Sequence, residues 1–247
     1  MKIIASDYDG TLNHGGIDDK KREAIKKWRS AGNIFAIVSG RGTADALAIK
    51  EKDKLDVDYF VATNGAIIMD SEGRRVCDVK CDGAIATPLL KLLFECGCPW
   101  GHVQTDFPCR VYAEKENCKN SGEYMLDNVP PIAFFNQINT ELPDCEKAEK
   151  VTAKIKEKFG NLLNPLQNGT CIDIIRADMD KAKGIYMLLD ILGAKYEDVI
   201  AVGDNINDLA MIKEFRSYAM DNGVELIKDL ADSTVSSVTE LIEKELQ

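Results

Sequence analysis

Two short apolar runs, each followed at once by a pair of aspartates, limit the folds open to this chain. The runs span residues 2–5 and 199–202, and the aspartates that follow them are Asp7, Asp9, Asp204 and Asp208. An apolar run that ends in Asp, Gly and Asn is typical of a buried strand followed by a turn. Two such strands side by side in a parallel sheet would bring all four carboxylates to one edge of that sheet.

Four carboxylates at one sheet edge predict a bound cation. Negative charges a few ångströms apart repel one another and raise one another's pKa unless a cation joins them. Mg²⁺ is a hard divalent cation that takes oxygen ligands, so it resolves this conflict. The pattern therefore indicates a metal-assisted enzyme.

Composition and charge exclude several other classes. The chain has 247 residues, is 45% apolar, and carries a net charge of −10, which disfavours a general nucleic-acid or membrane-surface binder. No segment approaches the roughly 20 apolar residues of a membrane span, and the N-terminus becomes acidic too early for a signal peptide. We expect a cytoplasmic protein, as a monomer or small homo-oligomer, with no nucleic-acid or membrane partner.

The eight cysteines do not form a metal-site pattern. Cys96 and Cys98 are two apart and Cys77 and Cys81 are four apart, but no second regular pair accompanies them and His102 is the only imidazole nearby. Zinc sites favour regularly spaced pairs closed by His or Cys. Free, mostly buried thiols in a reducing compartment explain the pattern better.

Strands and helices alternate at both ends of the chain. The expected strands lie at 2–6, 34–38, 59–62, 199–202 and 217–220. The expected helices lie at 18–31, from about 43, and at 180–192, 208–214, 223–229 and 238–245. This alternation predicts a parallel, right-handed βαβ sheet.

The alternation weakens in the middle of the chain, which holds most of the cysteines and prolines. Helices are expected there at 87–96 and 146–159, and strands at 111–113, 133–138 and 171–175. The predicted fold is therefore α/β: a Rossmann-like parallel-sheet core, formed by residues 1–81 and 179–247, with an inserted α/β cap domain at 82–178.

The spacing of Asp7 and Asp9 suits a two-step displacement at phosphorus. Two residues apart beyond a strand end, both side chains face the same side of extended backbone. One carboxylate can attack phosphorus, and the second can protonate the leaving oxygen and then deprotonate water. The Gly10–Thr11 backbone could bind phosphate. Alone, an exposed Asp-rich turn explains this pattern equally well.

Further positions could hold a phosphoryl group. Ser39 and Gly40 end the second strand in VSGR, where a hydroxyl and backbone N–H groups can bind a phosphoryl oxygen. Either Lys181 or Lys183 would neutralise charge on that group. Helix capping explains Ser39 alone, and solvation explains either lysine alone. Capping by Asp and Asn in GDNIND explains one acidic residue, not four at the ends of two strands.

Taken in order, these motifs resemble those of the haloacid dehalogenase-like hydrolase superfamily. They are D-x-D-G-T-L, the serine of VSGR, a lysine at a helix start, and GDNIND-x-x-M. The Thr63-Asn64-Gly65 turn and the long insertion are similar to the Cof-type branch, which has a large α/β cap. The resemblance covers nearly the whole predicted core.

The resemblance implies a Mg²⁺-dependent phosphatase with an aspartyl-phosphate intermediate. The resemblance implies that Asp7 is the nucleophile and Asp9 the general acid/base, whose backbone carbonyl also contacts the metal. It implies that Asp204 is a metal ligand and that Asp208 and Asn207 support the metal and its waters. Ser39, Gly40 and the motif lysine would then surround the phosphoryl oxygens.

The motif lysine has two candidates. The family usually has K-G, and Gly184 follows Lys183. The distances to Leu192 and Asp204 fit Lys181 better, and related chains tolerate K-A-x-G. We therefore assign Lys181.

The expected activity is that of a phosphoric monoester hydrolase on small phosphorylated metabolites, with sugar phosphates as the preferred class. A sugar phosphomutase would share Asp7 and Asp9 but re-phosphorylate its product. A catalytically inactive metal- or sugar-phosphate-binding protein could keep the same motifs. A phospho-accepting regulatory domain fits less well because it needs no leaving-group acid. The cap residues that could reach a substrate are Cys109, Arg110, Lys115 and Lys119. Exposure to solvent at the surface explains each of them better, so they do not identify the substrate.

Overall fold

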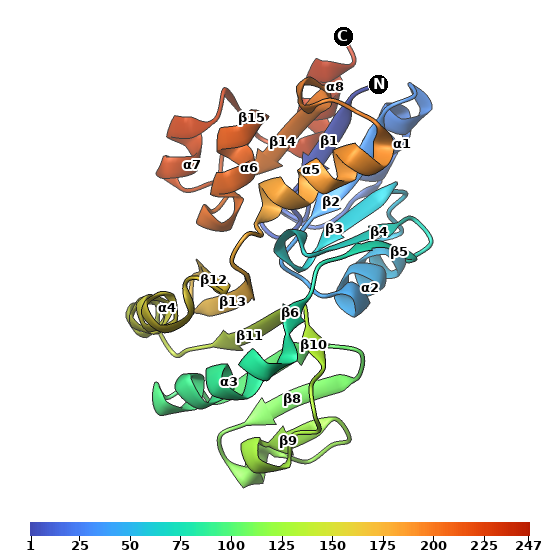
Figure 1. The fold of residues 1–247 in the computed structure, drawn as a ribbon. Coiled ribbons are helices and arrows are strands. Elements are labelled where there is room, and N and C mark those ends of the chain that lie inside the picture. Colours follow the sequence, from blue (N-terminus) through green and yellow to red (C-terminus); the bar gives the residue numbers. More distant parts are fainter. The chain divides into compact units, whose positions relative to one another are not determined.

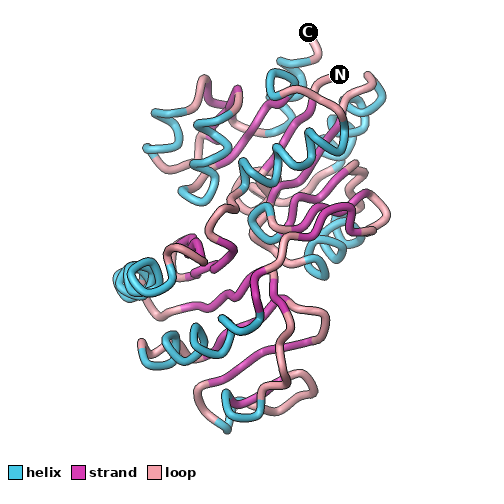
Figure 2. Tube along the Cα trace, in the orientation of Figure 1, coloured by secondary structure: helices cyan, strands magenta, loops and turns pink.

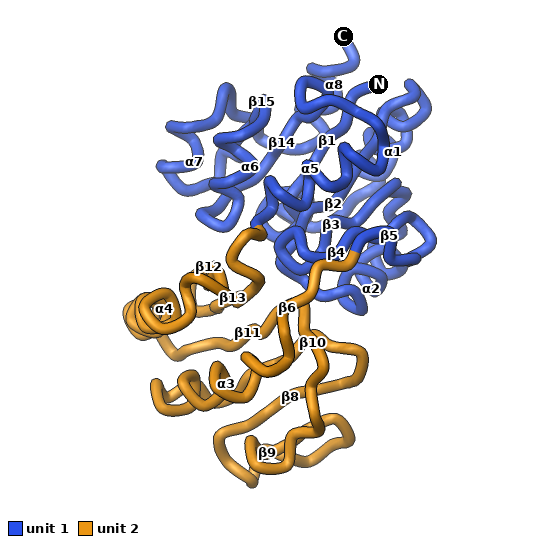
Figure 3. Tube along the Cα trace, in the orientation of Figure 1, with its two compact units in different colours: residues 1–77, 180–247 blue, residues 78–179 orange.

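The computed structural model describes residues 1–247 and divides the chain into two compact units (Figure 3). The core unit comprises Met1–Cys77 and Asp180–Gln247, and the inserted unit comprises Asp78–Met179. The boundaries expected from the sequence, after residues 81 and 178, lie within four residues of these. The core unit is therefore discontinuous in sequence, whereas the inserted unit is one continuous stretch.

An eight-stranded sheet forms the centre of the core unit (Figure 1). Its strands are β1 (Ile3–Ser6), β2 (Ile34–Val38), β3 (Tyr59–Ala62), β4 (Ile67–Asp70), β5 (Arg75–Asp78), β14 (Val199–Gly203), β15 (Arg216–Met220) and β16 (Ser233–Val235). Their order is β16-β15-β14-β1-β2-β3-β4-β5. All neighbours from β16 to β3 are parallel, and β4 pairs antiparallel to β3. The predicted parallel-sheet fold is confirmed.

The middle of the sheet joins the two ends of the chain. β1 pairs with β14 in a register that sets Ile3 opposite Val199 and Ser6 opposite Val202. Both strands are buried along their whole length, as expected for a parallel sheet covered on both faces. Because the strands are parallel and in register, the residues that follow them leave the sheet at the same edge.

Helices cover both faces of this sheet (Figure 1). They are α1 (Asp19–Ser30), α2 (Thr43–Asp53), α5 (Lys181–Leu192), α6 (Leu209–Glu214), α7 (Glu225–Leu230) and α8 (Val238–Glu245). α1, α2 and α8 pack on the face that carries Ile4 and Phe35, and α5 and α6 pack on the face that carries Ile3 and Ala5. This arrangement follows from side chains that alternate between the two faces of each strand.

Helix α1 shows how local sequence sets these elements. Asp18 caps its N-terminus by accepting a hydrogen bond from the Lys21 N–H at 2.9 Å. The buried residues Ala24, Ile25 and Trp28 recur at helical spacing and form its core face. The indole N–H of Trp28 donates to the Ile34 carbonyl at 2.7 Å, so the buried ring leaves no polar atom unpaired.

The inserted unit contains a six-stranded sheet of order β12-β13-β11-β7-β8-β9 and a separate β10-β6 pair. Strands and helices follow one another along its trace (Figure 2). The elements are β6 (Cys81–Asp82), α3 (Ala86–Glu95), β7 (Trp100–Gln104), β8 (Pro108–Tyr112), β9 (Glu123–Met125), β10 (Phe134–Phe135), β11 (Gln137–Glu141), α4 (Cys145–Phe159), β12 (Leu163–Asn168) and β13 (Cys171–Arg176). Apolar side chains of α3, α4 and the large sheet form its own core.

Two expectations for this unit are wrong in detail. The single strand expected at 133–138 is divided between two sheets at Asn136, whose buried amide donates to the Asp78 carboxylate at 2.6 Å and the Val79 carbonyl at 2.7 Å. β12 lies outside the expected strands, and it contains Pro165. The proline is tolerated since β12 is an edge strand of the sheet.

All eight cysteines are free thiols. Only Cys81, Cys98 and Cys109 are buried, so the expectation of mostly buried thiols is wrong. Burial raises the pKa of Cys81 to about 12 and those of Cys98 and Cys109 to about 11. Cys145 and Cys171 are exposed.

None of the eight α-helices combines the length and the apolar character that a bilayer crossing requires.

Candidate active site

Three of the four predicted aspartates meet at one edge of the core sheet. Asp7 directly follows β1, and its N–H donates to the Val202 carbonyl at 2.9 Å, which ties it to β14. Asp204 directly follows β14, and Asp208 lies one helical turn further on. One carboxylate oxygen from each of Asp7, Asp204 and Asp208 lies within 4.8 Å of the others.

Gly10 allows this close approach. It has a φ of +84°, a conformation that side chains disfavour. A Cβ atom at this position would lie 2.4 Å from Oδ2 of Asp204. The next residue, Thr11, donates its hydroxyl hydrogen to Oδ1 of Asp204 at 2.6 Å. The D-x-D-G-T sequence therefore positions a carboxylate that comes from the far end of the chain.

Lys181 is the buried cation of the site. It is the first residue of α5, which Asp180 caps by accepting from the Lys183 N–H at 2.8 Å. The Lys181 side chain is 0% exposed, and its Nζ lies 2.6 Å from Oδ1 of Asp7 and 2.5 Å from Oδ1 of Asp208. Lys183 is exposed, and its Nζ lies over the Tyr186 ring instead. Of the two candidate lysines, Lys181 is the one that reaches the carboxylates.

Asp208 stabilises the turn formed by residues 204–208. Its Oδ2 accepts from the N–H groups of Asp204, at 3.0 Å, and Asn205, at 3.1 Å. Both oxygens of Asp208 are therefore engaged by protein donors, since Oδ1 accepts from Lys181. Asn207 lies in the same turn, directly before Asp208, and its Oδ1 is buried without a hydrogen-bond partner.

The cluster carries an excess of negative charge. Three carboxylates and one ammonium leave a formal charge of −2. Burial and repulsion from Asp208 raise the pKa of Asp7 to about 8, against the opposing effect of Lys181. Burial also raises the pKa of Asp204. Burial disfavours the Lys181 cation, but Asp208 and Asp7 outweigh it and raise its pKa. A hard divalent cation fits this group because the group is rich in oxygen ligands and carries excess negative charge. The unpartnered Oδ1 of Asn207 could accept a hydrogen bond from a metal-bound water.

Ser39 stands at the end of the neighbouring strand β2. It is buried, its N–H donates to the Val61 carbonyl at 2.9 Å, and its Oγ accepts from the Arg41 N–H at 3.2 Å. Its own carbonyl accepts from the Asn64 N–H at 3.0 Å. The Ser39 hydroxyl hydrogen thus stays available to a ligand. Gly40 lies between Ser39 and Arg41 in the same loop, which is hereafter called the 39–41 loop.

A strained turn at residues 63–65 supports both the 39–41 loop and α5. Thr63 and Asn64 have φ values of +56° and +50°, which are unusual for residues with side chains. The Thr63 N–H donates to the Arg41 carbonyl at 2.9 Å. At Gly65, with φ +101°, a Cβ atom would lie 2.2 Å from the Asp180 carbonyl oxygen. The turn therefore braces the loop of Ser39 and the start of the Lys181 helix together.

Asp9 stands apart from the acidic cluster. Its side chain is 49% exposed and pairs with Arg41, with Nε 2.7 Å from Oδ2 and Nη2 2.8 Å from Oδ1. The expected contact of Asp9 with a metal concerns its backbone carbonyl and stays a prediction. Sequence reasoning missed Arg41, the contact of the Thr11 hydroxyl with Asp204, and the bracing role of the 63–65 turn. Arg41 lies within the VSGR motif, which was the available signal for it.

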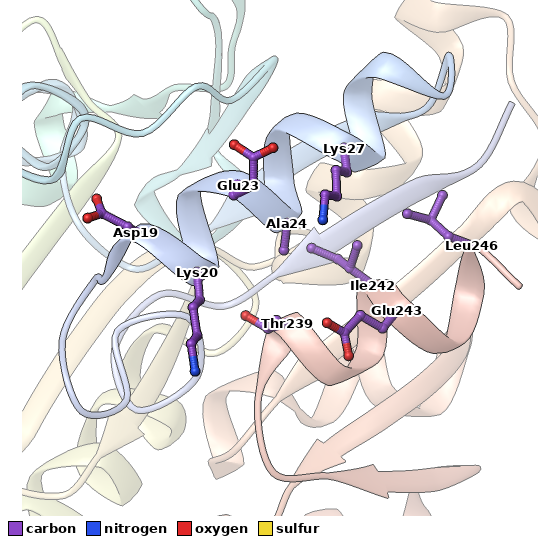
Figure 4. Close-up of a pocket in the computed structure, with 9 residues that line it drawn as sticks. All are labelled: Asp19, Lys20, Glu23, Ala24, Lys27, Thr239, Ile242, Glu243 and Leu246. Carbon is purple, nitrogen blue, oxygen red and sulfur yellow. The ribbon is translucent and has the colours of Figure 1, made fainter.

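A separate pocket of about 490 Å³ lies between α1 and α8 (Figure 4). Ala24, Ile242 and Leu246 contribute its apolar surface, and charged side chains of both helices surround them. None of the predicted site residues lines it. The pocket therefore adds nothing to the acidic cluster.

A family model for haloacid dehalogenase-like hydrolases matches residues 4–241 of the chain. Among curated proteins, the chain is 27% identical over 264 aligned positions to 5-amino-6-(5-phospho-D-ribitylamino)uracil phosphatase YwtE of Bacillus subtilis, covering 93% of this chain and 91% of that protein. It is 26% identical to the phosphatase of the same name, YbjI, of Escherichia coli, covering 90% and 86%.

Solved structures agree with the fold. A HAD/COF-like hydrolase from Plasmodium vivax has a TM-score of 0.84 at 22% identity, covering 100% of this chain and 95% of that one. The sugar phosphatase BT4131, described as HAD subclass IIB, has a TM-score of 0.79 at 17% identity, with 99% of each chain covered. The expected enzyme class, a phosphoric monoester hydrolase, agrees with the family and with these names. With the acidic cluster at its sheet edge and a family match over nearly its whole length, the chain belongs to the haloacid dehalogenase-like hydrolases.

Proposed function

We propose that the protein is a Mg²⁺-dependent phosphomonoesterase that hydrolyses small phosphorylated metabolites through an aspartyl-phosphate on Asp7. One observation carries the proposal: Asp7 lies beside Asp204 and Asp208, and the buried Lys181 bridges it to Asp208. This grouping gives a carboxylate nucleophile, a place for a divalent cation and a fixed positive charge within one small volume.

Asp7 and Asp204 would hold the metal directly, with Asp208 and Asn207 supporting its waters. Asp208 fits the supporting role because protein donors already engage both of its oxygens. When bound, Mg²⁺ supplies positive charge that offsets the repulsion between the carboxylate nucleophile and the phosphoryl oxygens. The metal would also offset the negative charge that raises the pKa of Asp7, and so favour its ionised, nucleophilic form.

In the first step an oxygen of Asp7 attacks phosphorus, and the bond between phosphorus and the ester oxygen breaks. Asp9 gives its proton to the departing oxygen, which leaves as an alcohol. In the second step Asp9 takes a proton from water, and the water oxygen attacks phosphorus. The bond between phosphorus and Asp7 then breaks, which releases inorganic phosphate and restores the Asp7 carboxylate.

Lys181, Ser39, Gly40 and Asn207 are proposed to hold the phosphoryl group. The Lys181 ammonium is fixed beside the nucleophile, so it offsets charge without reorganising during the reaction. The Ser39 hydroxyl can donate to a phosphoryl oxygen because its Oγ already accepts from the Arg41 N–H. Gly40 is included because it follows Ser39 in the 39–41 loop.

Sugar and polyol phosphates are the proposed substrate class. The curated relatives YwtE and YbjI are named for a phosphoribityl substrate, and BT4131 is described as a sugar phosphatase. The family resemblance further supports the inserted unit as a cap that selects the leaving group.

The test is phosphate release from sugar phosphates, nucleotides and p-nitrophenyl phosphate, with Mg²⁺ and with EDTA. We expect turnover with Mg²⁺ only, its loss in Asp7→Asn, and its retention in Asp190→Asn, an exposed aspartate outside the site. Formation of an isomerised sugar monophosphate when a sugar bisphosphate is added would indicate a mutase instead. A folded, Mg²⁺-loaded protein without turnover on any substrate would contradict an enzymatic role.

A further inference from the structure

We propose that Arg41 is a positioning residue, which orients the Asp9 carboxylate for proton transfer to and from the substrate. This inference rests on the proposed function, because it assigns Arg41 a part in the step that the function gives to Asp9. The juxtaposition behind it is a two-pronged ion pair between an exposed carboxylate and an arginine of the phosphate-binding loop.

The Asp9 side chain has no other partner in the structure that would orient it. It is 49% exposed, whereas Asp7 and Asp208 are buried and fixed by Lys181. A carboxylate on an open loop samples several rotamers, and each wrong rotamer removes it from the leaving oxygen. Proton transfer requires the donor within hydrogen-bond distance of its target, so an unrestrained Asp9 would be a poor acid.

The two hydrogen bonds from Arg41 fix both oxygens of Asp9. A guanidinium presents parallel N–H groups that match a carboxylate, and this geometry sets the plane of the carboxylate as well as its position. Each carboxylate oxygen can accept two hydrogen bonds, and Arg41 uses one on each. The remaining lone pairs stay available for a proton on its way to or from the substrate.

Arg41 is itself held in place at its backbone. Its carbonyl accepts from the Thr63 N–H at 2.9 Å, and its N–H donates to Ser39 Oγ at 3.2 Å. The guanidinium carbon lies 5.6 Å from the centre of the Tyr8 ring, and Tyr8 is buried. The strained 63–65 turn thus sets the place of the 39–41 loop, and the loop sets the place of the guanidinium.

A purely structural role explains this pair less well. Both side chains are about half exposed, at 42% for Arg41 and 49% for Asp9, so solvent weakens the contribution of this ion pair to folding stability. The guanidinium lines a pocket of about 240 Å³ together with Tyr8 and Asp45, so it is not part of a packed core. Loss of Arg41 should therefore leave the fold intact while it disturbs Asp9.

The test compares two leaving groups in Arg41→Gln. p-Nitrophenolate departs readily without a proton, whereas the alkoxide of a sugar phosphate needs one from Asp9. The ratio kcat/KM covers the steps up to leaving-group departure and excludes the shared hydrolysis of the aspartyl-phosphate. We expect kcat/KM to fall about 10²-fold for the best alkyl phosphate, since misplacement by about 1 Å costs that much. For p-nitrophenyl phosphate the fall should be only a few-fold.

Two further variants separate positioning from charge. Arg41→Lys keeps the positive charge but cannot form the two-pronged pair, so it should remain impaired on alkyl phosphates. In Asp9→Asn/Arg41→Gln, kcat/KM should be no lower than in Asp9→Asn alone, because Arg41 acts through Asp9. Arg74→Gln is the control, since it breaks another Arg–Asp pair outside the site, between exposed Arg74 in the turn before β5 and Asp70 at the end of β4.

Three results would overturn the inference: equal losses on both leaving groups, no loss on either, or full activity in Arg41→Lys. If Arg41→Gln does not fold, as judged by circular dichroism, a structural role is shown and the inference fails. Failure of the proposed function is distinguishable from all of these. In that case the wild-type protein releases no phosphate from either substrate.

Discussion

Lys181 is fully buried between the carboxylates of Asp7 and Asp208. Removing one partner from a buried ion-pair group leaves uncompensated charge and costs about 3–5 kcal/mol of stability. We therefore expect Lys181→Ala to lose turnover and to unfold at lower urea concentration than the wild type. Lys183→Ala is the control, and its free energy of unfolding should stay within about 0.5 kcal/mol of the wild-type value. The opposite ranking of the two variants in turnover would contradict the assignment of Lys181.

Asp7 links stability to pH and to metal. In the metal-free protein its folded pKa is raised from 3.8 to about 8, so the folded state binds a proton that the unfolded state releases. The resulting stability is fully present below pH 3.8 and is lost as pH rises through about 8. Thermal unfolding with EDTA should show a falling Tm over this range, less steep in Asp7→Asn.

Added Mg²⁺ should reverse this trend, because it binds the ionised carboxylates of the folded state. We expect the rise in Tm on adding Mg²⁺ to be larger at pH 8 than at pH 5. An equal rise at both pH values, or no rise, would argue against a metal at Asp7.

Asp7, Asp204, Asp208 and Lys181 could be singled out in the sequence because each sits where a predicted strand or helix begins or ends. The side-chain contacts of Thr11 and Arg41 could not be predicted, although both residues lie inside the same motifs. Their partners, Asp204 and Asp9, depend on how separate loops meet, and no local pattern encodes a contact between two loops. Asp9 itself was expected among the other acids, and only the structure shows its carboxylate turned to Arg41.

The 63–65 turn directly follows β3 and contacts both the 39–41 loop and the residue that caps α5. A Gly65→Ala side chain would meet the Asp180 carbonyl at 2.2 Å in a backbone conformation with φ +101°. We expect a loss of about 1–3 kcal/mol in stability, together with reduced turnover because α5 and Lys181 must shift.

Gly15→Ala is the matched control for that variant. Gly15 also has a positive φ, of +71°, but a Cβ atom there meets nothing within 4 Å. The Gly15→Ala variant should lose about 1 kcal/mol or less of folding stability and keep its turnover unchanged. Equal effects of the two variants on turnover would show that backbone conformation, and not contact with Asp180, matters at Gly65.

Elements whose apolar residues recur with a clear period were predictable from the sequence, whereas elements that depend on tertiary contacts were not. α3 and α4 begin within one residue of their expected starts because their apolar residues recur at helical spacing. β12 and β13 pair residue by residue, yet Pro165 and polar neighbours hide β12 in the sequence. The break at Asn136 was equally hidden, since it depends on hydrogen bonds to Asp78 and Val79, which lie far away in sequence.

The inserted unit is one continuous stretch with its own apolar core, so residues 78–179 should fold when expressed alone. In the folded fragment, Cys145 and Cys171 should react with a thiol reagent at once, whereas Cys81, Cys98 and Cys109 should react only after unfolding. Circular dichroism and timed thiol counting test this. Immediate reaction of all the thiols in the fragment would show that the unit depends on the core unit for its fold.

The core unit is assembled from both ends of the chain, with β1 beside β14 at the centre of its sheet. During synthesis on the ribosome, Asp7 emerges first, but Asp204 and Asp208 emerge only after most of the protein has been made. Until then the first strands have an open edge where β14 belongs, and chains that stall or are cut before residue 199 cannot close it. Incomplete copies of this protein should therefore be inactive and prone to aggregation or degradation.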